Sequence, residues 1–202
     1  EGWVLGLLST PKLMLQKNPE KTYKLLVKAS KWGQKYGAKI MGLGAFTSVV
    51  GDAGVTVSER SPISVTTGNS LTVAATIQSV ERILELAKKE ISNEKIAIVG
   101  ATGSIGKAVA RLLAKKNAKL ILISKTKKKL KMLAGELGGS VVSFGTDSDL
   151  LKDSKLIIGA TSSAGKAIPV DKLNSGSVVI DIALPPDLSK EEAAKRIDCL
   201  VL

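Results

Sequence analysis

Histidine is absent from this chain of 202 residues, cysteine occurs once, and aromatic residues make up only 3% of it. With Cys199 as the single thiol, an internal disulfide is excluded and a Cys/His metal site is not expected. This composition is typical of a reducing, cytoplasmic setting. No apolar run reaches the roughly 18 residues of a membrane span, so we expect a soluble protein without an integral membrane segment. A general acid or base would have to be Lys, Tyr, Asp, Glu or water, and the sequence does not choose among them.

Acidic residues are also scarce relative to basic ones. Thirty Lys and Arg stand against 18 Asp and Glu, a formal net charge of +12. This excess favours anionic partners such as a phosphorylated cofactor or an acidic carrier protein, although a lysine-rich solvated surface would give the same balance. The low aromatic content and the lack of a recognised nucleic-acid-binding motif argue against DNA or RNA as the partner.

The most informative stretch of the chain is residues 95–106, which read KIAIVGATGSIG. A short apolar strand runs into three glycines and then into a helix, as in the loop that binds the pyrophosphate of a dinucleotide. Gly100 can take the tight turn, Gly103 lets the backbone approach the phosphates, and Gly106 lets the helix pack closely on the strand. The segment therefore predicts a dinucleotide cofactor, against a purely structural glycine-rich turn.

Beyond residue 95, short β-rich runs alternate with helical stretches. Strands are expected near 95–99, 119–123, 140–144, 155–160, 177–182 and 197–202. The segments between them predict helices or short turns near 103–116, 126–137, 147–153, 169–173 and 188–195. This alternation predicts an α/β fold of the Rossmann type, a doubly wound parallel sheet with helices on both faces.

The first 70 residues are organised differently. We expect a helix from Pro19 to Tyr36, a short strand from Lys39 opening into a glycine-containing loop, a turn-rich passage to Pro62 and a strand at 63–66. A long helix from 71 to about 90 would follow, capped by Asn69 or Ser70.

Three segments result from these patterns. Residues 1–70 are expected to be part of a second, smaller α/β domain on the substrate side, 71–90 a connecting helix, and 91–202 the nucleotide-binding domain. Both ends lack the polar segments of natural termini, so we expect a fragment, truncated in its last domain.

The residues at the end of the second strand predict whether the cofactor carries a 2′-phosphate. In a site for NAD an acidic residue ends that strand, whereas here it reads SKTK at 124–127. Ser124 and Thr126 can donate hydrogen bonds, and Lys125 with Lys129 can neutralise a 2′-phosphate. The pattern favours NADP(H), the alternative being solvated lysines at the start of a helix.

Two further loops follow strands four and five, where such a fold binds the nicotinamide half. They read GATSSAG at 159–165 and DIALPPD at 181–187. The small residues Ala160, Thr161 and Ser162 would let the nicotinamide lie against the backbone. Ordinary turn chemistry is the alternative, with Asp181 satisfied by local backbone N–H groups. Cys199 is expected in an apolar strand, where thiols are usually inert.

Three motifs in this order resemble one family. GLGAFTSV at 42–49, TTGNSLT at 66–72 and IVGATGSIG at 98–106 are similar to stretches of the long-chain acyl-[acyl carrier protein] reductases of cyanobacteria, and the likeness extends over nearly the whole chain. The resemblance implies a shikimate-dehydrogenase-like NADP-binding domain and the NADPH-dependent reduction of an acyl thioester, carried by acyl carrier protein or coenzyme A, to a fatty aldehyde. In that family the acyl group is held on a cysteine, which by our alignment falls beyond residue 202.

The resemblance also implies roles for particular residues. The pyrophosphate cradle would comprise Gly100, Thr102, Gly103, Ser104, Ile105 and Gly106, and residues 124–126 would lie at the 2′-phosphate. The crevice between the domains would be faced by Phe46, Thr47, Ser48, Thr67 and Asn69.

Two other functions stay open at this point. A shikimate- or quinate-dehydrogenase-like enzyme would reduce a ketone with a lysine–aspartate pair instead of a cysteine. A non-enzymatic module would bind NADP(H) and regulate a partner. The sequence leaves open whether the protein forms a homo-oligomer.

Overall fold

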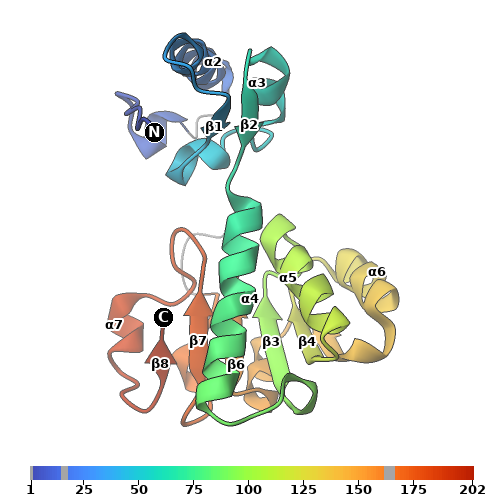
Figure 1. Cartoon of the computed structure of the whole chain (residues 1–202). Helices are drawn as coiled ribbons and strands as arrows, with labels where there is room; N and C mark the ends of the chain where they lie inside the picture. Colours follow the sequence, from blue (N-terminus) through green and yellow to red (C-terminus); the bar gives the residue numbers. More distant parts are fainter. Residues whose placement is uncertain (1, 15–17, 162–166) are drawn as a thin grey trace. The chain divides into compact units, whose positions relative to one another are not determined.

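The computed structural model describes residues 2–14, 18–161 and 167–202. The chain separates into two compact units, Glu1–Ser70 and Leu71–Leu202, and each has a hydrophobic core of its own (Figure 1). In the described ranges we find no helix with the length and apolar character needed to cross a membrane.

The second unit is built on a parallel sheet of six strands. In chain order they are β3 (Lys95–Val99), β4 (Lys119–Ile123), β5 (Val141–Gly145), β6 (Leu156–Gly159), β7 (Val178–Asp181) and β8 (Leu200–Val201). Their order across the sheet is β5-β4-β3-β6-β7-β8. This is the doubly wound order with its switch point between β3 and β6, and it confirms the predicted Rossmann-type fold. The last strand is shorter than predicted, because residues before Leu200 form a turn in which the Cys199 N–H donates to the Arg196 carbonyl (3.0 Å).

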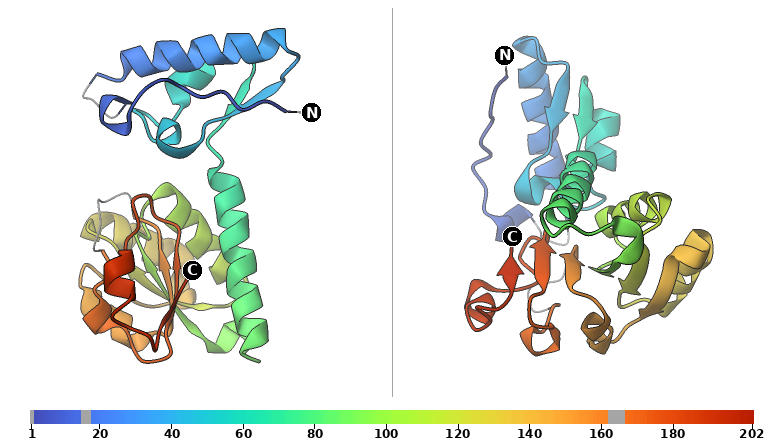
Figure 2. Two further views of the ribbon diagram at one scale, coloured as in Figure 1. Left: turned by 90° about the vertical axis from the view of Figure 1, so that its left-hand side faces the viewer. Right: turned by 60° about the horizontal axis from the view of Figure 1, so that its bottom comes forward.

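Successive side chains of each strand lie on opposite faces of this sheet. On one face Ile96, Ile98 and their neighbours pack against α4 (Asn69–Leu86), α5 (Ser104–Lys115) and α6 (Lys127–Leu137) (Figures 1 and 2). On the other face Ala97 and Val99 pack with η4 (Ser148–Asp153), η5 (Val170–Lys172) and α7 (Lys190–Ala193). Each fully buried Ile or Leu contributes about 1.5–3 kcal/mol. The strand ends are therefore held on a rigid scaffold.

Helix α4 differs from its prediction at both ends. It begins at Asn69, so Asn69 and Ser70 lie in its first turn and do not precede it, and it ends at Leu86 instead of near residue 90. Lys88 takes a left-handed conformation (φ 55°), and the N–H of Lys89 returns to the Leu84 carbonyl (2.9 Å), which terminates the helix. Four apolar side chains of α4 are buried in the core of the second unit, so from Leu71 on this helix is part of that unit: Val73, Ile77, Val80 and Leu84.

The first unit contains a two-stranded parallel sheet. Its strands are β1 (Ile40–Gly42) and β2 (Ser64–Thr66), and the helix α2 (Glu20–Lys35) precedes them close to the predicted bounds. The turn-rich passage expected after residue 50 is wrong in part, because it contains the helix α3 (Val55–Arg60), which begins after a left-handed Gly54 (φ 91°) and buries Val57. The short helix α1 (Pro11–Met14) and the 3₁₀ turn η1 (Ala45–Ser48) complete the described elements.

Candidate functional site

The glycine loop leaves β3 at the switch point of the large sheet. Gly100 has a φ of 82°, and its N–H and that of Ala101 both donate to the Ile123 carbonyl at the end of β4 (2.8 and 3.1 Å). A Cβ on Gly100 would lie 2.6 Å from the Ala160 carbonyl oxygen beyond β6. The turn is therefore tied to β4 and packed against the end of β6, with no room for a side chain.

Helix α5 begins directly on this turn. Ser104 is its first residue, and a Cβ on Gly106 would overlap the Gly100 carbonyl oxygen. Gly103 is less crowded, since its Cβ would lie 3.2 Å from the same oxygen, which is a tight contact and not an overlap. The first N–H groups of a helix have no partner within the helix and favour an anion. A tight glycine turn under the start of a helix therefore fits the pyrophosphate of a dinucleotide, on the six residues that the resemblance proposes.

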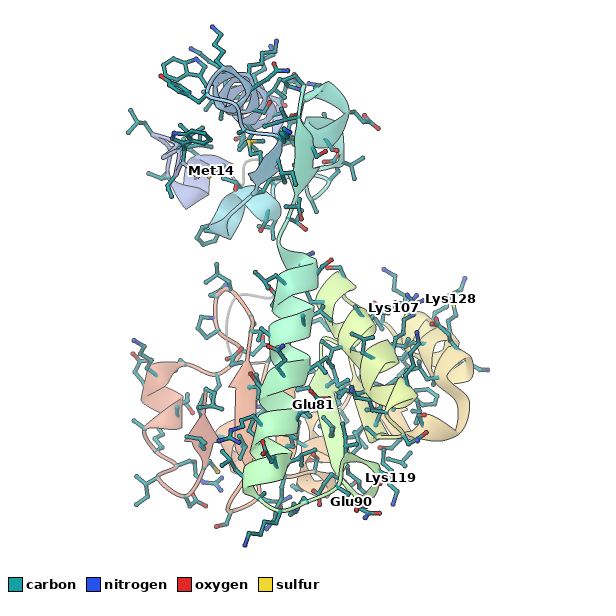
Figure 3. All side chains as sticks on the ribbon, in the orientation of Figure 1. Met14, Glu81, Glu90, Lys107, Lys119 and Lys128 are labelled. Carbon is teal, nitrogen blue, oxygen red and sulfur yellow. The ribbon has the colours of Figure 1, made fainter. Side chains whose placement is uncertain are left out.

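The opposite side of the loop reaches the residues proposed for a 2′-phosphate. The hydroxyl oxygens of Thr102 and Ser124 are 2.6 Å apart, so the end of β4 is joined to the glycine loop. Lys125, Thr126 and Lys129 are exposed beyond it, and no acidic residue occurs between 124 and 131. Lys128 projects from the outer surface of α6 (Figure 3). The arrangement can accept a phosphate.

The loop after β6 lies on the other side of the switch point. The Ala160 N–H donates to the Val99 carbonyl (2.9 Å). The Thr161 N–H donates to Asp187 Oδ2 (3.0 Å), and its hydroxyl donates to Asp187 Oδ1. Ser162, also proposed here, lies outside the described residues, as do residues 163–166. Ala160 and Thr161 thus lie beside the glycine loop.

Two carboxylates belong to the end of β7 and the loop after it, Asp181 as the last residue of the strand and Asp187 in the loop. Asp181 accepts from the N–H groups of Ala183 (3.1 Å) and Leu188 (2.8 Å), as the alternative of local turn chemistry supposed. Asp187 is completely buried. Burial raises the pKa of the Asp187 carboxyl, and the hydrogen bonds from Thr161 and the charge of Lys125 oppose that shift. Sequence reasoning gave Asp187 no role, and its only signal was an acid between a proline pair and an apolar residue. In the described ranges, Cys and acidic side chains form no group that could hold a metal ion.

The residues proposed for the substrate side all belong to the first unit. Since β1 and β2 are parallel, the segments that follow them lie at the same edge of the small sheet. The Thr47 hydroxyl donates to the Gly44 carbonyl (2.6 Å) and the Ser48 hydroxyl to the Ala45 carbonyl (2.7 Å), so both stabilise the η1 turn. This edge carries the five proposed residues: Phe46, Thr47 and Ser48 in η1, Thr67 after β2, and Asn69 in the first turn of α4.

Cys199 lies in the turn before β8 and not within a strand, which corrects the prediction. Its thiol is 3.4 Å from the Asn174 carbonyl oxygen, at the amino end of the parallel sheet, whereas the glycine loop follows the carboxyl end. We expect Cys199→Ser to leave the dissociation constant for NADPH within about twofold, because this half-buried thiol lies at the opposite end of the sheet from the glycine loop. Fluorescence titration of both proteins checks this, and a tenfold loss would place Cys199 near the cofactor.

Comparison with known families supports the nucleotide half in particular. The model for shikimate / quinate 5-dehydrogenase matches residues 81–199, more than half of the chain. Dipicolinate synthase from Bacillus halodurans superposes with a TM-score of 0.53 at 18% identity, covering 81% of this chain and 57% of that one. At this identity the superposition shows the fold alone.

Curated relatives differ in how much of the chain they match. The aminotransferase PigE of Serratia sp. is 37% identical over 82% of this chain and 20% of its own length. The long-chain acyl-[acyl-carrier-protein] reductase of Synechococcus elongatus is 28% identical over 93% of this chain and 57% of its own. The glutamyl-tRNA reductase of Methanothermobacter marburgensis is 32% identical over 54% of this chain and 29% of its own length. The chain spans between 20% and 57% of these relatives. Since the family model covers more than half of the chain, the chain belongs to the shikimate / quinate 5-dehydrogenase family, through an oxidoreductase domain of the NAD(P)-binding Rossmann type.

Proposed function

We propose that this chain is the cofactor-binding part of an NADP(H)-dependent reductase that converts a long-chain acyl thioester to an aldehyde. The observation that carries the proposal is the extent of one match. The acyl-[acyl-carrier-protein] reductase of Synechococcus elongatus is similar over 93% of the chain, through both units, whereas the family model begins at residue 81. The first unit, which the family model leaves unmatched, is thus shared with a reductase of that substrate class.

The site residues support the choice of cofactor. Bound NADPH supplies a hydride, and the residues described here bind and orient it. The glycine turn and the start of α5 would hold the pyrophosphate, while Ser124, Lys125, Thr126 and Lys129 would hold the 2′-phosphate. Ala160 and Thr161 would lie along the nicotinamide half. Holding the ring in a fixed position is the main contribution that such a domain makes to the rate.

A cavity in the first unit supports an apolar substrate. It has a volume of about 780 Å³ and is lined by residues of the N-terminal segment, α2 and β1, among them Trp3, Leu5, Leu26 and Met41. Ligand pockets usually measure about 300–1,000 Å³ and are mostly apolar. The cavity therefore suits a long acyl chain better than a small polyol, and the net charge of +12 suits an acidic carrier protein.

The proposal predicts turnover by the natural-length protein. NADPH oxidation should be observed with long-chain acyl carrier protein or acyl-coenzyme A, and intact-mass analysis without NADPH should show an acyl adduct on a cysteine other than Cys199. Cys199→Ser in the same protein is the matched control and should keep both signals.

The second candidate is reduction of a ketone, which the family match over residues 81–199 favours. Turnover on dehydroshikimate, with none on a thioester and no adduct, would replace the first proposal by this one. NADPH binding without turnover on any of these substrates would favour a regulatory module.

A further inference from the structure

Asp187 makes contacts on both sides of the segment that follows β6. Its carboxylate accepts from the backbone N–H and the hydroxyl of Thr161, and its main-chain carbonyl accepts from the N–H of Ile168 (3.3 Å). The residues that precede and follow positions 162–167 are thus both bound to one residue, which lies 26 positions beyond Thr161 in the sequence.

A second acid flanks the same point. A Cβ on Gly159 would lie 3.0 Å from Asp181 Oδ1 and 3.1 Å from Asp187 Oδ2, so both carboxylates lie close to the same side of the end of β6. Asp181 uses its oxygens on its own loop, at Ala183 and Leu188. Asp187 uses both of its oxygens on Thr161, so it joins the loop after β7 to the segment after β6.

The peptide that Asp187 holds also touches the glycine loop. The nearest atoms to a Cβ placed on Gly100 are the Ala160 carbonyl oxygen at 2.6 Å and carbon at 2.7 Å, followed by the Thr161 nitrogen at 2.9 Å. Thr161 N–H is the group that donates to Asp187. The Asp187 carboxylate therefore helps to hold the Ala160–Thr161 peptide against the proposed pyrophosphate cradle, together with the bond from the Ala160 N–H to the Val99 carbonyl.

Burying a carboxylate in order to hold a turn costs free energy. Its desolvation costs several kcal/mol, and only charge-assisted hydrogen bonds recover that cost. Asp187 is completely buried, and Ile168, whose N–H donates to its carbonyl, and the adjoining Leu188 are both core residues. The carboxylate is thus matched to the two donors of Thr161.

We propose that Asp187 is a positioning residue for the nicotinamide half of the cofactor, acting through the Ala160–Thr161 peptide. This inference rests on the proposed NADP(H) site. The adenosine side is held by other contacts, Thr102 to Ser124 and Gly100 to Ile123, which do not involve Asp187. Loss of the Asp187 carboxylate should therefore weaken binding at the nicotinamide end. At the adenosine end it removes a negative charge that acts on Lys125, which should not weaken a contact with a phosphate.

The test compares two ligands on the 202-residue chain. NADPH reaches both ends of the site, whereas adenosine 2′,5′-bisphosphate reaches the adenosine end alone. We expect Asp187→Ala to weaken NADPH by about 10-fold or more, since two hydrogen bonds to a charged group are lost, and to leave the bisphosphate within about twofold. The emission shift of the bound dihydronicotinamide ring should also be lost.

Two further variants keep the test decisive if Asp187→Ala does not fold. In Asp187→Asn the amide oxygen can accept from the Thr161 N–H and the amide nitrogen can donate to its hydroxyl, so most of the NADPH affinity should return. Thr161→Val removes only the hydroxyl contact and should give a loss between these two. Bisphosphate binding shows in each case that the nucleotide unit is folded.

The outcomes separate the inference from the proposed function. If the unaltered chain binds neither ligand, the NADP(H) site itself is wrong. If the chain binds both but the variants weaken both equally, Asp187 only supports the fold and the inference fails. It fails as well if NADPH binding is unchanged, or if NADPH binds no tighter than the bisphosphate in the unaltered chain.

Discussion

Replacing Gly100 by alanine is expected to lower the free energy of unfolding of the second unit by about 2–4 kcal/mol and to abolish NADPH binding. A left-handed backbone costs a residue with a Cβ about 1–2 kcal/mol. The Cβ would also meet the Ala160 carbonyl at 2.6 Å, and that residue cannot move freely because its N–H is bonded to Val99 (2.9 Å). Urea unfolding and NADPH titration measure the two effects.

Gly135→Ala is the matched control for this change. Gly135 lies within α6, and a Cβ placed there meets nothing within 4 Å. Alanine is favoured over glycine inside a helix by about 0.5–1 kcal/mol, so this variant should be slightly more stable and should bind NADPH normally. A Gly100→Ala protein as stable as Gly135→Ala would contradict the described turn.

The paired replacement of Lys125 and Lys129 by alanine is expected to reduce NADPH affinity by about 10–100-fold and to leave NADH affinity unchanged. The physical reason is that each of these exposed charges contributes about 1 kcal/mol to binding the 2′-phosphate, so the pair contributes about 2 kcal/mol that NADH cannot receive. Parallel titrations with the two nucleotides measure the ratio of NADPH affinity to NADH affinity. The ionic strength is kept fixed, because salt screens exposed charges.

Lys128→Ala provides the control for general charge. It removes one lysine from the outer surface of α6, the helix that also carries Lys129 (Figure 3), and should change neither affinity by more than about twofold. Equal affinity of the unaltered chain for NADPH and NADH would refute the proposed 2′-phosphate site, and equal effects of all lysine changes would reduce it to a general attraction.

The core of the large sheet could be predicted because its information is local. Each buried strand is a short run of Ile, Val and Leu, and the predicted bounds of β3 and β4 agree with the observed ones. The glycine turn was also predictable, because glycines at 100, 103 and 106 are close together in the sequence. In both cases the residues that form the feature are neighbours in the sequence.

Other features depend on contacts between distant residues. Helix α4 stops at a left-handed Lys88, where no glycine or proline marks the end. Helix α3 is stabilised by burying Val57 in the core of the first unit, while its surroundings consist of turn-forming residues. The role of Asp187 needs Thr161, which is 26 residues away. No pattern within one window of the sequence contains these partners.

The two sides of the proposed site are translated at different times, because their residues lie in different parts of the sequence. Three hydrogen bonds on the adenosine side lie within residues 100–145: one between Thr102 and Ser124, one from Gly100 to Ile123, and one from the Ser124 N–H to the Gly145 carbonyl (3.2 Å). On the nicotinamide side, the hydrogen bonds that hold Thr161 need Asp187. A ribosome releases the chain from its N-terminus, at about 5–20 residues per second. A nascent chain therefore has all the residues of its phosphate-binding side for several seconds before the acid that completes the nicotinamide side has been translated.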